Sequence, residues 1–319
     1  MRLVYMGTPE FARPPLVCLC QSKHELLAVV TGRDKKAGRG QMLLPTPCRQ
    51  EAEKHGLSVL TPDSLDDEQL FRELEALKPD LFVVAAFRVL PEKLFALPRL
   101  GSINIHASLL PRYRGAAPIN WALINGDKET GLTSFFLKKK VDCGEIILQE
   151  KVPIYDEDNF DSLYERLSKL AGPFLLKTLE VIEQGACQPL LQDNVLATRA
   201  PKITPFDALI DFGFPAERVR NFIRGLSTRP GAYSFFRGLK IKIFAAAVAP
   251  YPENGQLRPG TVLPVRKKLV LQCDNSAVEI LRLLPEGKKE MDGLSFINGF
   301  KPKPGEVFGE IEKNSEKQK

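Results

Sequence analysis

The chain has 319 residues, of which 44% are hydrophobic and 26% are charged, and its formal net charge is +6. This length suits two domains, and the balance of apolar and charged residues excludes a disordered or fibrous chain. The longest apolar run, 81–87, is too short to span a bilayer, and the first residues show no secretory signal, so we expect a cytoplasmic protein. The six cysteines form no C-x-x-C pair and there are only three histidines, so we predict reduced thiols and no metal site.

Strands and helices alternate through the first half of the chain. A helical pattern at 66–78 lies among five apolar runs, most of them continuous, at 3–7, 26–31, 57–60, 80–86 and 102–106. Continuous apolar runs are typical of strands that are buried on both faces of a parallel sheet. The alternation therefore predicts an α/β fold with a Rossmann-like, doubly wound and mostly parallel sheet.

The pattern changes after residue 131. Residues 132–154 contain two β-rich runs on either side of a charged segment, which predicts an antiparallel extension of the sheet. An amphipathic helix is expected at about 159–184. The polar segment that follows contains several prolines and has no clear period. We therefore expect an N-terminal domain at 1–188 and a linker at 189–205.

Residues 206–310 have the pattern of a second domain. One short helix, 216–227, precedes several short strands that are separated by turns containing glycine or proline, which predicts a small OB-like β-barrel. The charged tail, 311–319, is expected to fray. From residue 206 onward there are 19 lysines and arginines against 13 acidic residues, so this third carries the whole positive excess. Either a solvated basic surface or a nucleic-acid partner accounts for that charge.

Two segments that follow early strands have the composition of binding loops. In "YMGTPEFA" (5–12), Thr8 is expected to cap a helix that starts at Pro9. This turn is not G-x-G-x-x-G, so a nicotinamide oxidoreductase is a weak interpretation. The second segment, "TGRDKKAGRGQML" (31–43), interleaves glycines with basic side chains. It is either a solvated loop or an arm that grips phosphates, through Arg33, Lys35, Lys36 and Arg39.

The run "INIHASLLPRYRGAAPI" (103–119) places polar side chains at the end of a buried strand. Asn104, His106 and Ser108 have period-two spacing, so they share one face, at the carboxyl edge where open α/β sheets bind ligands. A lone histidine is more often a packed residue than a catalyst. Here its same-face neighbours are polar: Asn104 supplies an amide donor, and histidine is a side-chain type suited to proton exchange. Asp142 is a candidate for the acid that is missing, but spacing alone does not pair it with the histidine.

The segment "NIHASLLPRYRGAAPINWALINGDKETG" (104–131) resembles the folate-dependent formyltransferases, whose motif is Asn-x-His-x-Ser-Leu-Leu-Pro followed by a distant Asp-x-Gly. The resemblance implies 10-formyltetrahydrofolate as co-substrate and no metal. It further implies that Asn104, His106 and Asp142 are catalytic. The residues implied to shape the folate site are Ser108, Leu109, Leu110 and Pro111.

Three further features are similar to the members of that family that formylate methionyl initiator tRNA. They are the opening "MGTPEFA", the basic segment "DKKAGRG" (34–40) and the basic C-terminal third. The resemblance implies a monomer that makes N-formylmethionyl-tRNA for translation initiation. Lys138 and Lys140 depart from an Asp-x-Gly pattern before the aspartate, and Arg88 departs from a glycine-containing loop. The alternatives are a formyltransferase acting on a small amine, nucleotide or sugar, and a noncatalytic RNA-binding protein.

Overall fold

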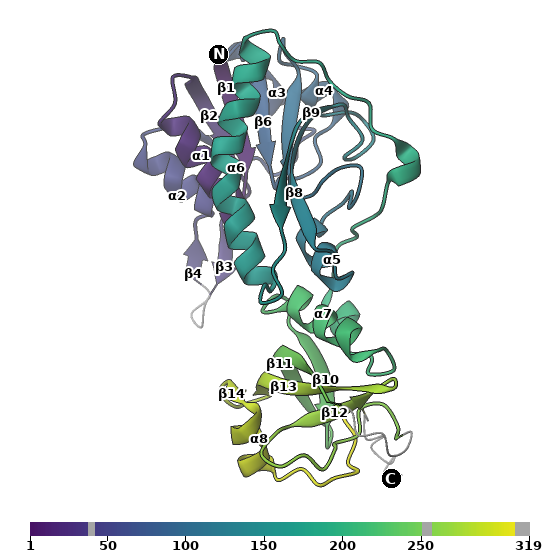
Figure 1. Cartoon of the computed structure of the whole chain (residues 1–319). Coiled ribbons are helices and arrows are strands. Elements are labelled where there is room, and N and C mark those ends of the chain that lie inside the picture. Colours follow the sequence, from purple (N-terminus) through teal and green to yellow (C-terminus); the bar gives the residue numbers. More distant parts are fainter. Residues whose placement is uncertain (38–41, 251–256, 310–319) are drawn as a thin grey trace, which may run out of the picture. The chain divides into compact units, whose positions relative to one another are not determined.

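A seven-stranded sheet forms the centre of the N-terminal part of the chain (Figure 1). The structure is a computed structural model that describes residues 1–37, 42–250 and 257–309. It divides the chain into two units that are described separately below. The first unit comprises Met1–Pro118, Glu129–Pro153 and Tyr164–Pro201. The second comprises Ile119–Lys128, Ile154–Leu163 and the described part of the chain from Lys202.

The sheet of the first unit has the strand order β5-β2-β1-β6-β7-β8-β9. The first five strands in this order run parallel, and β8 and β9 add to the edge in antiparallel fashion. The strands are β1 (Arg2–Gly7), β2 (Glu25–Val30), β5 (Val59–Leu60), β6 (Leu81–Ala85), β7 (Ser102–His106), β8 (Glu129–Phe136) and β9 (Ile146–Pro153). The predicted Rossmann-like, mostly parallel sheet and its antiparallel extension are confirmed.

The chain order of the strands reverses between β1 and β6. From β1 the chain passes to β2 and then to β5 on one side, and it then crosses to β6 on the other side of β1. In open α/β sheets the loops at the carboxyl ends of the strands diverge at such a reversal and leave a crevice that binds ligands. The loops after β1, β2, β5 and β6 are therefore expected to form a binding site.

Helices cover both faces of this sheet. Leu70 and Leu74 of α3 pack with alternate residues of β1 and β6 on one face, where α4 also contributes. The long helix α6 runs along the sheet (Figure 1), and its Thr178 hydroxyl donates to the Ser134 hydroxyl of β8 over 3.0 Å. The helices are α1 (Arg13–Cys20), α2 (Pro47–Lys54), α3 (Glu68–Ala76), α4 (Glu92–Phe95) and α6 (Phe160–Glu183). Each fully buried leucine on such a face stabilises the fold by about 1.5–3 kcal/mol.

The turn after β1 differs from the expectation. A short 3-10 helix, η1 (Glu10–Ala12), comes first, and α1 begins only at Arg13, so Thr8 is not its cap and Pro9 is not its first residue. The reason is that Pro14 lacks an N–H and fits best at the start of a helix, where no intrahelical partner is needed. The Thr8 hydroxyl instead accepts from the Gly32 N–H over 3.1 Å, which ties the loop after β1 to the loop after β2.

The basic segment after β2 contains a hairpin that the sequence did not reveal. Strand β3 (Lys35–Ala37) pairs antiparallel with β4 (Met42–Leu44). Lys35 and Lys36 belong to β3, whereas Arg39 lies outside the described residues. None of the helices in the described ranges combines the length and apolarity that a membrane crossing needs.

The second unit contains the expected barrel-like sheet, with strand order β10-β11-β13-β12 and β14 paired with β13. Register shifts along β11 increase its twist and help the sheet to curl. Its strands are β10 (Ala232–Phe236), β11 (Leu239–Ala249), β12 (Val270–Cys273), β13 (Ser276–Pro285) and β14 (Met291–Asp292). The helices α5 (Pro118–Ile124), α7 (Ala216–Leu226) and α8 (Gly293–Phe300) accompany them, with η3 (Pro205–Ala208) before α7. The prediction of an OB-like second domain is confirmed, but α8 was not foreseen.

Candidate active site

Strand β7 carries Asn104 and His106 to the carboxyl edge of the sheet. It lies between β6 and β8, and His106 is paired with Thr133 of β8. The Thr133 hydroxyl donates to the Ser108 carbonyl over 2.6 Å and accepts from the Leu110 N–H over 3.1 Å. Because one side chain satisfies two backbone groups, the chain can turn sharply just after the strand. His106 is therefore held at the start of a fixed loop.

The imidazole of His106 is buried and oriented on both sides. Its Nε2 lies 2.8 Å from the carbonyl oxygen of Tyr113. A carbonyl can only accept, so Nε2 carries the proton and donates. The other nitrogen, Nδ1, lies 3.9 Å from Oδ2 of Asp142. The nitrogen that is free to exchange a proton therefore faces the carboxylate, at a distance that suits a bridging water or a substrate atom.

Asp142 comes from the turn between β8 and β9. Its φ of 53° lies in the left-handed region, which aspartate tolerates better than most residues. Its Oδ2, the oxygen that lies 3.9 Å from His106 Nδ1, accepts from the Gly115 N–H over 2.9 Å, so the carboxylate is fixed in position. Two residues on, Gly144 cannot carry a side chain, because a Cβ there would lie 1.6 Å from the Phe136 carbonyl oxygen. The tight turn of the Asp-x-Gly motif thus has a packing cause.

The Asn104 side chain has a buried atom without a partner. Within the described residues, its Oδ1 accepts no hydrogen bond although it is shielded from solvent. Leaving such a group unpaired costs free energy, and a bound molecule with an N–H or O–H removes that cost. Asn104 lies two residues before His106 on β7, so both side chains stand on one face of the sheet. The structure thus places all three predicted catalytic residues at one edge.

The four residues expected to shape the folate site lie directly after β7. Ser108 and Leu110 are buried, and the Ser108 hydroxyl donates to the Arg112 carbonyl over 2.7 Å. The Leu110 carbonyl accepts from the Gln149 side chain over 2.8 Å. Leu109 and Pro111 are partly exposed, and their carbonyls accept from Arg112 and Thr198. The backbone carbonyls of Leu109, Leu110 and Pro111 therefore already accept hydrogen bonds from within the protein.

A turn-closing ion pair explains one of the departures from the family pattern. Lys138 pairs with Glu145 across the turn that carries Asp142. The hydrogen bond from Lys138 holds the pKa of the Glu145 carboxyl below its ordinary value. The ammonium at position 138 thus helps to hold the two ends of this turn together.

Sequence reasoning missed the contribution of residues 190–200, which lie in the expected linker. The Ala200 N–H donates to the Arg114 carbonyl oxygen over 2.7 Å, and the Tyr113 N–H donates to the Thr198 hydroxyl over 2.8 Å. Gln192 and Asn194 of the same segment bind the Arg114 guanidinium. The segment also contains the short 3-10 helix η2 (Asn194–Leu196). The segment is polar and has neither a helical nor a strand period, so its sequence does not indicate these contacts.

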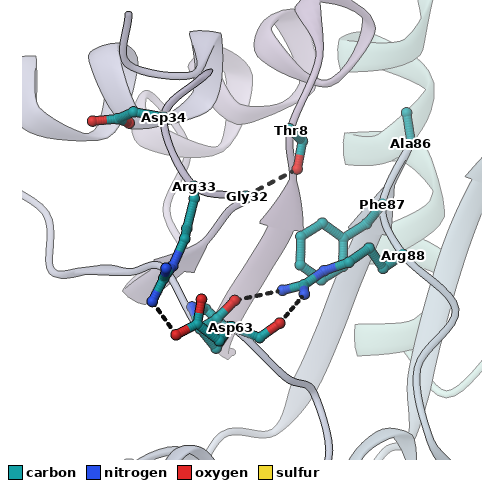
Figure 2. Close-up of a pocket in the computed structure, with 9 residues that line it drawn as sticks. Thr8, Gly32, Arg33, Asp34, Asp63, Ala86, Phe87 and Arg88 are labelled. Atoms are coloured by element: carbon teal, nitrogen blue, oxygen red, sulfur yellow. Dashed lines mark hydrogen bonds and ion pairs between the residues drawn. The ribbon is translucent and has the colours of Figure 1, made fainter. Parts of the chain in front are cut away.

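A cavity of about 420 Å³ lies where the strand order reverses. Figure 2 shows Arg33 and Arg88 approaching the loop of Asp63 from two sides, with Phe87 beside Arg88. Arg33 forms an ion pair with Asp63. Arg88 donates to the carbonyl oxygens of Pro62 and Asp63 over 3.0 and 2.9 Å. The loops after β1, β2, β5 and β6 all contribute to the wall, as the strand order leads one to expect.

Comparison with known proteins gives matches along nearly the whole chain. The model of the "Formyl transferase" family matches residues 1–179, and that of "Formyl transferase, C-terminal domain" matches residues 202–301. The chain is 41% identical to the methionyl-tRNA formyltransferase of Caldanaerobacter subterraneus, over 97% of this chain and 100% of that protein.

Solved structures share the fold. The methionyl-tRNA formyltransferase from Clostridium thermocellum is matched with a TM-score of 0.55 at 16% identity, over 88% of this chain and 99% of that one. HypX from Aquifex aeolicus, solved with tetrahydrofolic acid, is matched with a TM-score of 0.63 at 19% identity over 94% of this chain. The chain spans 47% of the length of HypX.

Proposed function

The chain belongs to the formyl transferase family, and from this premise we propose that it formylates the free amino group of methionyl initiator tRNA. The donor is 10-formyltetrahydrofolate, and the product is N-formylmethionyl-tRNA for translation initiation. One observation carries this proposal: relatives named methionyl-tRNA formyltransferase are about 40% identical from end to end, across both family domains. The enzyme acts as a cytoplasmic monomer.

Asn104 and His106 stabilise the charge that the reaction creates. The methionine nitrogen attacks the formyl carbon, the C–N10 bond of the folate then breaks, and a tetrahedral oxyanion lies between these steps. Donors aimed at such an oxygen lower the barrier most when they are fixed in advance. The short strand and the Tyr113 carbonyl fix the imidazole. The Asn104 amide, on the same face, supplies the second donor.

His106 and Asp142 move the proton. The attacking nitrogen must lose a proton, and N10 of the folate must gain one as it leaves. Nε2 of His106 is already committed to Tyr113, so the exchange takes place at Nδ1, which faces Asp142 at 3.9 Å. In this scheme a proton on Nδ1 passes to N10, and the Asp142 carboxylate accepts the proton from the amine through a water. No covalent intermediate on the protein is required.

The folate is proposed to occupy the cavity where the strand order reverses. Folate has a flat aromatic body and an anionic glutamate tail. Phe87 offers an apolar face to the aromatic part, and Arg88 offers a guanidinium to a carboxylate (Figure 2). Ser108, Leu109, Leu110 and Pro111 do not line this cavity, and we assign them to the part of the folate site nearer to His106. The unpartnered Oδ1 of Asn104 would accept from a donor on either co-substrate.

Basic residues on both units are proposed to bind the RNA. The C-terminal residues carry the positive excess of the chain. The hairpin that begins with Lys35 and Lys36, together with Arg39, is proposed to contact phosphates of the acceptor stem. Arg33 is predicted to have the same role. It lies in the cavity of Figure 2 and is paired with Asp63, so an RNA phosphate would have to compete with that ion pair.

The test is a formyl-transfer assay with purified protein and 10-formyltetrahydrofolate. Methionyl initiator tRNA should be formylated, whereas free methionine and small amino sugars or nucleotides should react far more slowly. Transfer to a small amine that equals transfer to the tRNA would instead support the alternative acceptor. Binding of RNA without any turnover or folate binding would support the noncatalytic alternative.

A further inference from the structure

The segment 198–200 runs alongside the loop 111–114 and is bonded to its backbone. The Arg114 N–H donates to the Thr198 carbonyl oxygen over 2.9 Å, and the Thr198 N–H donates to the Pro111 carbonyl oxygen over 3.3 Å. Both bonds join backbone groups, so they would form with almost any residue at position 198. A role that is specific to threonine must therefore come from its side chain.

The Thr198 hydroxyl adds such a contact. It accepts from the Tyr113 N–H over 2.8 Å, so Thr198 binds the N–H groups of both Tyr113 and Arg114. Tyr113 is buried, and its φ of 62° lies in the left-handed region, where a bulky side chain is strained. A strained conformation persists only where neighbouring groups hold it in place. Thr198 supplies two of the hydrogen bonds that hold Tyr113 in this conformation.

The peptide group that Thr198 holds is the one that binds the imidazole. The Tyr113 carbonyl oxygen lies 2.8 Å from Nε2 of His106. The N–H of the same peptide group belongs to Arg114 and donates to the Thr198 carbonyl oxygen. A peptide group is planar, so a bond that fixes its N–H also fixes the direction of its C=O. Thr198 therefore acts on the imidazole through one rigid group.

Asp142 acts on the ring in the opposite direction. Its Oδ2 lies 3.9 Å from Nδ1 of His106, and a carboxylate only accepts, so it favours a proton on Nδ1. The Tyr113 carbonyl oxygen favours a proton on Nε2. A neutral imidazole has one such proton for which the two acceptors compete. The position of the Tyr113 carbonyl therefore decides which tautomer is present.

We propose that Thr198 is a positioning residue that keeps His106 in the tautomer with the proton on Nε2. The proposal rests on the proposed function, in which Nδ1 gives a proton to the leaving folate nitrogen. After that step the ring is neutral only if Nε2 has kept its own proton, because a ring without both protons is an unfavourable anion. Without the Thr198 hydroxyl the Tyr113 N–H loses an acceptor. Tyr113 can then relax to a negative φ and turn its carbonyl away from the ring.

The first experiment determines the tautomer by NMR on the full chain without substrates. The chain has three histidines, so long-range ¹⁵N–¹H spectra contain three imidazole signals, and the spectrum of His106→Ala assigns the one of interest. The buffer is alkaline, so that an ordinary imidazole is neutral. The wild type should have the proton on Nε2. In Thr198→Val, which keeps the side-chain shape and removes the hydroxyl, the fraction with the proton on Nδ1 should rise severalfold.

Two variants serve as controls for this measurement. Thr198→Ser retains the hydroxyl and should restore the wild-type tautomer. Thr204→Val removes a threonine hydroxyl that donates to Asp207 over 2.7 Å, six positions further along the chain. This variant should leave the imidazole signal unchanged. Thermal unfolding of all variants shows whether each is folded.

The second experiment measures formyl transfer. We expect Thr198→Val to lower kcat about tenfold, the scale of one net hydrogen bond, with both KM values nearly unchanged and with rescue by Thr198→Ser. An unchanged tautomer in a folded Thr198→Val variant would overturn the proposal, and so would a Thr198→Ser variant that is as impaired as Thr198→Val. If the tautomer shifts as expected but the wild type formylates no methionyl-tRNA, the positioning of His106 stands and the proposed function fails.

Discussion

Gln192 connects Arg114 to the turn of Asp142. Its Nε2 donates to the main-chain carbonyl oxygens of Asp142, at 3.0 Å, and of Gly144, at 2.8 Å. Its Oε1 accepts two N–H groups of the Arg114 guanidinium. One neutral side chain from the expected linker thus holds both the proposed catalytic turn and the Arg114 guanidinium.

Replacing Gln192 should therefore slow catalysis without removing a group that touches substrate. We expect Gln192→Ala to lower kcat about tenfold, because small displacements of catalytic groups are costly. We also expect the pH profile of kcat to shift, since the Asp142 carboxylate would move relative to His106. Gln192→Glu still accepts from Arg114 but cannot donate to the two carbonyls, so it tests the donor half alone. Gln184→Ala, in the turn just after α6, is the control, and a pH profile that stays fixed in both Gln192 variants would refute the positioning role.

His106 should be the residue most sensitive to substitution. We expect His106→Ala to lower kcat by roughly 10²–10⁴, the usual scale for general acid–base catalysis. The affinity for folate and tRNA should change little, because the imidazole acts on the transferred group. Single-turnover experiments at saturating substrates separate chemistry from binding. A single-turnover rate near that of the wild type would exclude His106 from proton transfer.

Arg88 should contribute to folate binding rather than to chemistry. Its guanidinium donates to two carbonyls of the 62–63 loop, which fixes its position and leaves its positive charge uncancelled. We expect Arg88→Ala to raise the Kd for folate about tenfold, as when one charged hydrogen bond is lost, with kcat nearly unchanged. Isothermal titration with 10-formyltetrahydrofolate measures this. An unchanged Kd would show that the glutamate tail of the folate does not bind at Arg88.

The Lys138–Glu145 pair should make the active-site turn sensitive to acid. The pKa of Glu145 is lowered in the folded protein, so its carboxylate stabilises the fold above its unfolded pKa, and this contribution disappears as pH falls through the lower folded value. The pair is partly exposed, so we expect less than about 1 kcal/mol at neutral pH. The Tm difference between wild type and Glu145→Gln should be largest near pH 7 and should shrink below the ordinary pKa of a glutamate. A constant difference across this range would contradict the assignment.

The features that could be predicted from the sequence are those that depend on a local pattern of residues. The buried run 102–106 became β7 with the expected bounds, and it indicated the edge where Asn104 and His106 lie. Asp142 was named from a resemblance, because its pairing with His106 depends on β8 lying beside β7, a contact between distant segments. Gln192 could not be found, since its partners are backbone carbonyls and a guanidinium, which impose no residue pattern. Helix α8 was missed for a local reason, because its two glycines weaken the helical signal while the Asp292 side chain caps it by accepting from Ser295.

Gly115 lies between the Asp142 carboxylate and the backbone of Ala200. Its φ of 130° is accessible to glycine but is rarely adopted by residues with a side chain. A Cβ at this position would lie 2.4 Å from the Ala200 carbonyl oxygen. Gly115→Ala must therefore shift either residues 198–200 or its own N–H, which donates to Asp142. We expect a loss of stability of about 1–3 kcal/mol together with a fall in kcat.

Gly56→Ala is the matched control for this variant. Gly56 also has a positive φ, of 64°, but a Cβ at that position meets nothing within 4 Å. The Gly56→Ala variant therefore reports the backbone strain alone, and the kcat of this variant should stay at the wild-type value. Thermal unfolding and kcat measured on both variants separate strain from the clash with residue 200. If Gly115→Ala loses no more activity than Gly56→Ala, the close approach of residues 198–200 is not what fixes the Asp142 carboxylate.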